Sequence, residues 1–300
     1  MSLIESVSSK LLRILPSDYF LAVRNTYAKL RKRASPLLRW LYGSFTTDDL
    51  IAGIAARVDD DWDILMVHSS VNNLAPAYDG NAGELLRALI EFVGPERTLV
   101  MPAFNFGDYG EGARDRFLRD PRFDLRRAPS QMGLLTELFR RSRGVLQSRH
   151  PVYRIAALGP RAAELVAGHE LAPRGMGENT PFDYMARHNA QIVGIGKSFQ
   201  VMTQVHHVES LLADSWPAPT LELPAIEVSV AVDQRETISM QLGGVQQQWR
   251  FNIWKLRELL GPEELQEWRF HGCPMFAARA QTVTDALQAA AARGFTLYDP

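Results

Sequence analysis

The chain has 300 residues, of which 46% are hydrophobic and 22% are charged, as in an ordinary soluble globular protein. The formal net charge of -1 gives no general argument for a nucleic-acid partner. A single cysteine, Cys273, excludes an intrachain disulfide, argues against a cysteine-built metal site and suits the cytoplasm. No apolar run approaches the ~20 residues that span a bilayer, and no signal-peptide pattern is present. We therefore expect a cytoplasmic protein without a bound metal.

The N-terminal segment differs from the rest of the chain in charge. Residues 1–43 carry eight Lys or Arg against Glu5 and Asp18, a balance of +6. Apolar residues lie between these charges, and Pro16 and Pro36 are expected to break helices. A basic amphipathic segment can lie as a peripheral contact on an anionic membrane surface. Packing on its own domain or in a homodimer is favoured, because many helices have this pattern. We predict a basic amphipathic helical extension at 1–45 and a single domain at 46–300.

Strands and helices are predicted to alternate through the first two thirds of that domain. A capping residue at Thr46 indicates a helix start. Residues 107–130 are expected to form a long polar loop. Strands are predicted at 64–68, 98–101, 155–158 and 191–195, and helices at 82–93, 132–141, 161–167 and 183–187. This alternation predicts an α/β fold with a central mixed, largely parallel sheet and helices on both faces.

The pattern changes after about residue 216. Residues 225–232, 237–240 and 248–251 alternate in polarity, as half-buried strands do. They predict an antiparallel extension toward the C-terminus. Helices are expected at 254–260 and 283–292.

The segment that follows the strand at 191–195 carries candidate chemistry. Thr203, His206 and Glu209 are spaced three apart, so a helix opening at Thr203 would place all three side chains on one face. A histidine held by a carboxylate can remove a proton from a substrate amine or hydroxyl. An isolated pair of this kind is more often structural, so other residues must support it. His207 is rotated by about 100° from His206, so we expect it to pack or to contact the acceptor.

Three motifs, taken in order, form one pattern. They are Val67-His-Ser-Ser70, then Gln147-Ser-Arg-His-Pro151 with the preceding helix Gly133–Arg140 and the strand ending at Gly159, then Thr203-x-x-His206-x-x-Glu209. Over residues 46–300 the chain resembles the aminoglycoside 3-N-acetyltransferase family. The resemblance implies an enzyme that transfers acetyl from acetyl-coenzyme A (acetyl-CoA) directly to an amine on a sugar-like ring, without a metal.

The resemblance also assigns catalytic roles. His206 matches the general base and Glu209 the carboxylate that orients it, while Thr203 matches a threonine just upstream. Thr203 could donate a hydrogen bond to the oxyanion or to the leaving sulfur, could cap the helix, or could do both.

Coenzyme-binding roles follow from the other two motifs. Ser69 and Ser70 match the loop that lines the coenzyme groove, and Ser148 and His150 match a motif near it. His150 is expected to be structural or to form a groove wall. His68, before this loop, is a core histidine or faces the groove. Gln147 and Arg154 depart from the pattern, which has arginine and serine there.

The acceptor remains open between two classes of amine. Aminoglycosides are polycations, so a dedicated site should be strongly acidic. Residues 107–124 instead hold five acidic and four basic side chains. That balance suits an acceptor with a phosphate, such as a nucleotide-linked amino sugar. The alternative to an enzyme is a non-catalytic family member that binds a sugar-like ligand or a partner in the same groove, but the intact Thr203, His206 and Glu209 argue against it.

Overall fold

The computed structural model describes residues 35–107 and 112–300, so most of the predicted N-terminal extension lies outside the described residues. Its last part forms helix α3 (Ser35–Tyr42). Pro36 lies in the first turn of α3, where a missing backbone N–H is tolerated. Across the described part of the chain, no helix is both long and apolar enough to cross a membrane.

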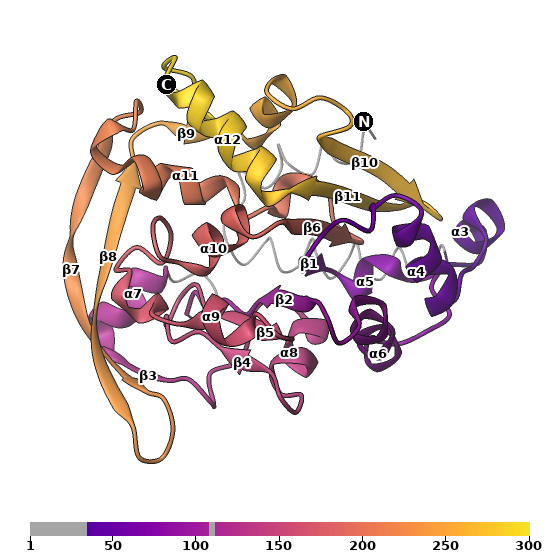
Figure 1. Cartoon of the computed structure of the whole chain (residues 1–300), viewed down its shortest axis with the longest axis horizontal. Coiled ribbons are helices and arrows are strands. Elements are labelled where there is room, and N and C mark those ends of the chain that lie inside the picture. Colours follow the sequence, from indigo (N-terminus) through magenta and orange to yellow (C-terminus); the bar gives the residue numbers. More distant parts are fainter. Residues whose placement is uncertain (1–34, 108–111) are drawn as a thin grey trace.

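A seven-stranded mixed sheet forms the centre of the molecule (Figure 1). Its order is β10-β11-β6-β1-β2-β5-β4, and its parallel neighbour pairs are β6–β1 and β1–β2. The mixed sheet predicted from the sequence is confirmed, with its parallel part limited to these three strands. The strands are β1 (Ile64–Ser69), β2 (Thr98–Pro102), β4 (Leu146–Gln147), β5 (Ile155–Leu158), β6 (Ala190–Ile195), β10 (Leu265–Phe270) and β11 (Cys273–Arg279).

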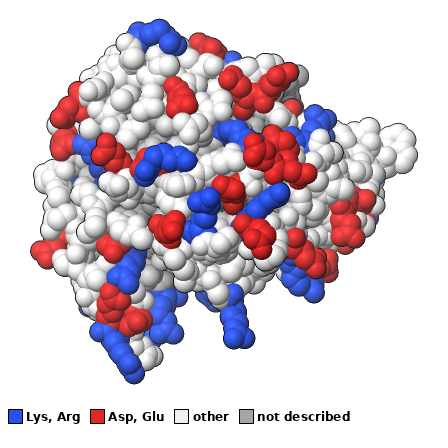
Figure 2. Space-filling view, viewed as in Figure 1, with Lys and Arg blue, Asp and Glu red and all other residues white. Residues whose placement is uncertain are grey.

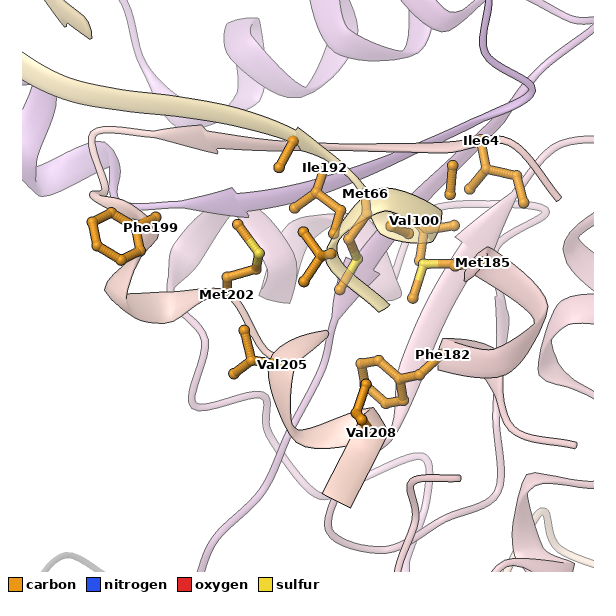
Figure 3. Close-up of a cluster of buried hydrophobic side chains, with 14 of the residues drawn as sticks. Ile64, Met66, Val100, Phe182, Met185, Ile192, Phe199, Met202, Val205 and Val208 are labelled. Carbon is orange, nitrogen blue, oxygen red and sulfur yellow. The ribbon is translucent and has the colours of Figure 1, made fainter. Parts of the chain in front are cut away.

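Helices cover both faces of this sheet, as predicted, because successive residues of its strands point to opposite sides. On β1, Leu65 and Val67 pack with the helices of one face, and Ile64 and Met66 pack with those of the other (Figure 3). The first face holds α4 (Thr47–Ala55), α5 (Val71–Leu74), α6 (Ala82–Val93) and α8 (Leu134–Arg140). The second holds α9 (Ala162–Val166), α10 (Pro181–Arg187), α11 (Val205–Leu212) and α12 (Ala280–Ala291).

A long hairpin stands apart from the central sheet, at the left of Figure 1. Strands β7 (Thr220–Ala231) and β8 (Thr237–Gln247) pair antiparallel, and β3 (Arg122–Asp124) joins them in a separate three-stranded sheet. The antiparallel extension of the central sheet toward the C-terminus is instead made by β10 and β11. The predicted strand at 248–251 is the short β9 (Arg250–Phe251), which pairs with β12 (Tyr298–Asp299).

Two predicted segments differ from the structure in detail. The loop expected at 107–130 contains α7 (Ala113–Arg119) and β3, because Phe117 and Phe123 are buried under the hairpin. The helix expected at 254–260 is a 3₁₀ helix at Ile253–Glu258. Further 3₁₀ turns lie at His169–Leu171, Phe199–Val201 and Ala213–Ser215.

Candidate active site

Helix α11 places the predicted catalytic residues, although it begins at Val205 rather than at Thr203. The buried side-chain amide of Gln204 anchors its start by donating to the Phe182 carbonyl at 3.0 Å and to the Thr284 hydroxyl at 3.2 Å. Val205 and Val208 point into the core, Val208 beside Phe182 (Figure 3). Because these valines fix the rotation of the helix, His206 and Glu209 are turned toward a cavity.

His206 and Glu209 form the predicted pair on that side of α11. The His206 Nδ1 atom lies 2.7 Å from Glu209 Oε1. An ionised carboxylate only accepts hydrogen bonds, so Nδ1 carries the proton and Nε2 keeps a lone pair. The His206 side chain is 38% exposed and lines the cavity. The arrangement is therefore that of an oriented imidazole with a free acceptor nitrogen.

Two further side chains hold Glu209 from distant parts of the chain. Gln247 of β8 donates through Nε2 to Glu209 Oε2 at 3.0 Å, and the Tyr298 hydroxyl of β12 lies 2.9 Å from Oε1. Burial, and secondarily the Glu209 charge, raise the pKa of Tyr298, so its hydroxyl stays protonated and donates. Neither residue was predicted, because each reaches the carboxylate through long-range strand pairing that leaves no local sequence signal.

The cavity beside His206 has a volume of about 760 Å³, which falls within the usual range for small-molecule sites. It lies between α11, the β7–β8 hairpin and the segments at 104–106, 113–114 and 174–176. Its aromatic lining comes from Phe104, Phe106, Tyr153 and Trp216. A flat ring or a hydrocarbon arm can therefore pack here beside a polar catalytic group.

The charged lining of the cavity is mixed. Glu222 forms an ion pair with Arg174, so their charges compensate each other. Arg114 and Asp214 also line the cavity, and neither forms an ion pair among residues 35–107 and 112–300. The described part of the cavity lining thus offers one uncompensated cation and one uncompensated anion besides the His206–Glu209 pair.

Thr203 lies in the turn just before α11, where its carbonyl accepts from the His206 N–H at 3.1 Å. Its hydroxyl does not cap the helix. The Thr203 Oγ1 atom is buried, and it has no hydrogen-bond partner in the described part of the chain. A buried hydroxyl without a partner is costly. A hydrogen bond to a ligand oxygen or sulfur would therefore satisfy the Thr203 hydroxyl.

Ser69 and Ser70 lie at the carboxyl end of β1, half-buried. The Ser70 N–H donates to the Ile195 carbonyl of β6 at 2.8 Å, so this loop and the segment that leads to α11 leave the same edge of the sheet. The two serines are not among the residues that line the cavity. Contact between them and a coenzyme stays a prediction.

His68, just before this loop, is buried among core side chains. Burial, and secondarily the Lys197 charge, lower its pKa to about 4. Its Nε2 atom has no hydrogen-bond partner among the described residues.

Ser148 and His150 are fully buried and lie outside the cavity wall. The Ser148 hydroxyl accepts from the Ile155 N–H at 2.8 Å, and His150 Nδ1 accepts from the Tyr153 N–H at 3.0 Å. They therefore hold the segment that carries Tyr153 into the cavity. Their proposed roles near a coenzyme stay predictions.

Arg154, the unusual residue after this motif, is also fully buried. It donates to the carbonyl groups of Ala103, Leu125 and Ala128, and burial lowers its pKa to about 10. Arg154 thus ties together two segments behind the cavity.

Buried histidines support the opposite wall, at residues 174–177. His169 donates through Nε2 to the Gly175 carbonyl at 2.8 Å, and the Gly177 N–H donates to His207 Nδ1 at 3.3 Å. Gly175 has a φ of +69°, and a Cβ there would lie 2.8 Å from His150 Nε2, so the position requires glycine. His207 is fully buried and does not line the cavity.

A metal site is not apparent in the described part of the chain, where no cluster of three His, Cys, Asp or Glu side chains could hold one. The arrangement is that of acid–base chemistry on a small molecule, carried by an α/β protein with a His–Glu pair at the carboxyl end of a parallel strand.

Comparison with known proteins agrees with this class. The family model for aminoglycoside 3-N-acetyltransferase matches residues 66–291. Aminoglycoside N(3)-acetyltransferase IX of Micromonospora chalcea is 30% identical over 161 residues, which are 50% of this chain and 57% of that protein. Aminoglycoside N(3)-acetyltransferase III of Serratia marcescens is 30% identical over 177 residues, covering 56% and 63%. These alignments therefore span less than two thirds of either relative.

Solved structures share the fold over most of the chain. AAC-IIIb in a binary complex with CoASH superposes with a TM-score of 0.66 at 23% identity, covering 85% of this chain and 99% of that one. AAC-VIa bound to sisomicin gives 0.65 at 22% identity, covering 83% and 98%. With the family model matching most of its length, the chain belongs to the aminoglycoside 3-N-acetyltransferase family.

The buried histidines predict an acid-sensitive fold. Burial lowers the pKa of His169 and His207 to about 4, against an ordinary value of about 6.5. Between these values the unfolded chain binds more protons than the folded one. Stability that is complete above about pH 6.5 should therefore fall progressively as the pH drops toward 4.

Urea unfolding at about pH 7.5 and about pH 5 measures this effect. His169→Gln, which cannot titrate, should show a shallower pH dependence than the wild type. Equal stability of the wild type at both pH values would contradict the prediction.

Proposed function

We propose that the protein is an acetyl-CoA-dependent N-acetyltransferase that acylates an amine of an amino sugar or aminoglycoside by direct transfer. The observation that carries the proposal is the His206–Glu209 pair at the cavity wall, with Glu209 fixed by Gln247 and Tyr298. Family membership and the fold shared with AAC-IIIb in complex with CoASH support the same reaction.

His206 acts as the general base in this proposal. Acetyl-CoA supplies the acetyl group as a thioester. The Nε2 lone pair of His206 accepts the proton that the acceptor amine releases as its nitrogen bonds to the acetyl carbon. Glu209 holds the ring through Nδ1 and stabilises the imidazolium. The thioester carbon–sulfur bond then breaks, and the leaving thiolate takes the proton from the His206 imidazolium, which gives an amide, free coenzyme A and the neutral histidine.

Thr203 completes the proposed chemistry. Its buried hydroxyl has no hydrogen-bond partner among the described residues, and Thr203 belongs to the same cavity wall as His206. We assign it a hydrogen bond to the thioester oxygen, which gains charge during attack, or to the departing sulfur. The presence of Thr203, His206 and Glu209 together at the cavity wall favours an enzyme over the non-catalytic alternative.

The charge of the cavity bears on the acceptor. The relatives and AAC-VIa with sisomicin are aminoglycoside acetyltransferases, and they support an amine acceptor. In this chain Arg174 compensates Glu222, and the positive charge of Arg114 is matched by the negative charge of Asp214. Several ammonium groups would find few carboxylates here. This balance favours an amino sugar that also carries a phosphate, such as a nucleotide-linked amino sugar.

Replacing the base tests the reaction directly. His206→Ala should lower kcat/KM for acetyl transfer by about 10²–10⁴-fold, because the amine then loses its proton acceptor. Acetyl-CoA should still raise the melting temperature of the variant, since mass action requires only binding. Transfer at the wild-type rate would show that His206 is not the base.

Tyr298→Phe removes the hydroxyl that donates to Glu209 and keeps the packing of the aromatic ring. Losing this donor leaves more negative charge on Oε1, the oxygen that faces His206, and so favours the protonated imidazole. We expect kcat to fall about tenfold and the acidic limb of the pH–rate profile to move to higher pH. An unchanged profile with reduced stability would assign Tyr298 a structural role only.

Arg114→Ala tests the acceptor class. Losing a charge-assisted contact should raise the KM for a nucleotide-linked amino sugar about tenfold and should not raise it for sisomicin. Arg127→Ala, whose side chain is 90% exposed, serves as the matched control. Turnover of sisomicin with none of nucleotide-linked amino sugars would contradict the phosphate-bearing acceptor.

A further inference from the structure

Helix α3 presents an apolar face to solvent at the edge of the molecule. Leu37 is 63% exposed, Trp40 80% and Leu41 58%. Their spacing of three and four residues places them on one side of the helix. Figure 1 shows α3 at the right edge of the fold, and the same edge projects in Figure 2 with an uncharged tip. Isolated exposed leucines need no explanation, but an exposed Trp with two leucines on one helical turn forms a patch.

The other side of α3 is fixed to the body of the protein. Arg39 forms an ion pair with Asp79 at 2.6 Å and donates to the Pro76 carbonyl at 3.1 Å. The Tyr42 carbonyl lies 2.6 Å from His271 Nδ1. These contacts set the rotation of the helix, so its apolar face is held away from the rest of the described domain.

The chain that leads into α3 is strongly basic. Residues 29–33 contain Lys29, Arg31, Lys32 and Arg33, and residues 1–34 carry seven basic side chains against two acidic ones. The partner of the apolar face must therefore accept both positive charge and inserted Trp and Leu side chains. A second copy of this chain would bring the same positive charge and be repelled. An anionic lipid surface supplies what both features require.

We propose that α3, together with the basic segment before it, docks the protein on an anionic membrane surface. Leu37, Trp40 and Leu41 insert at the boundary between head groups and acyl chains, where Trp is favoured. The basic side chains contribute about fivefold each to the partition constant. This surface lies on a different part of the fold from the cavity, so the proposal does not depend on the proposed reaction.

The test is co-sedimentation of the full chain with vesicles. Binding should be strong to phosphatidylcholine vesicles that contain about one third phosphatidylglycerol, weak to pure phosphatidylcholine, and reduced by high salt. The double variant Trp40→Ala with Leu41→Ala should lower the partition constant at least about tenfold. Leu171→Ala, which alters a leucine 81% exposed outside α3, is the matched control and should bind like the wild type.

Several outcomes would overturn the proposal. They are no binding of the full chain to anionic vesicles, equal binding to neutral vesicles, or no effect of the double variant with its melting temperature preserved. A double variant that converts a dimer to a monomer in light scattering would assign the face to a second copy instead. Replacing Lys32 and Arg33 by Ser should also weaken binding more than tenfold, and unchanged binding would count equally against it.

Discussion

The Glu209 carboxylate is the point at which three separate segments of the chain meet. It bonds to His206 within α11, to Gln247 from the hairpin and to Tyr298 from the last strand. A partly buried carboxylate needs such donors, because leaving it without them would cost far more than any one of the bonds contributes. The position of the hairpin over the cavity, the closure of β12 on β9 and the orientation of the imidazole are therefore coupled through one side chain.

The central sheet fixes the position at which these three segments meet. Its three parallel strands carry the loop at Ser69 and the turn before α11 out of one edge, and buried side chains on both faces fix the helices there. Buried polar groups also fix the positions of single segments around the site. Gln204 fixes the start of α11, and His169 fixes the Gly175 wall. Gln204 and His169 are residue types that also occur in catalytic sites, but here they support the site, whereas His206 lies at the cavity wall.

Features that depend on residues close together in the sequence could be predicted from it. The helix at 82–93 was expected with its observed ends, because Gly94, with a φ of +71°, stops it where the apolar period ends. Helical phase likewise separated His206 from the buried His207. The strands β10 and β11 were missed. Leu265–Phe270 is an edge strand with as many polar as apolar residues, and the mostly buried strand Cys273–Arg279 runs straight into a helix. Gln247 and Tyr298 were missed because their partner lies 38 and 89 residues away.

The distance of 89 residues between Glu209 and Tyr298 has a consequence for synthesis in the cell. A ribosome releases α11 well before it makes β12, so the newly made carboxylate lacks its tyrosine donor while the hairpin and strands β10 and β11 emerge. During that interval α11 can pack on the sheet through Val205 and Val208, but its polar side remains incompletely bonded. Assembly of the cavity wall is therefore a late event, and any change that slows or displaces the pairing of residues 250–251 with 298–299 would leave a folded sheet with an unfinished site.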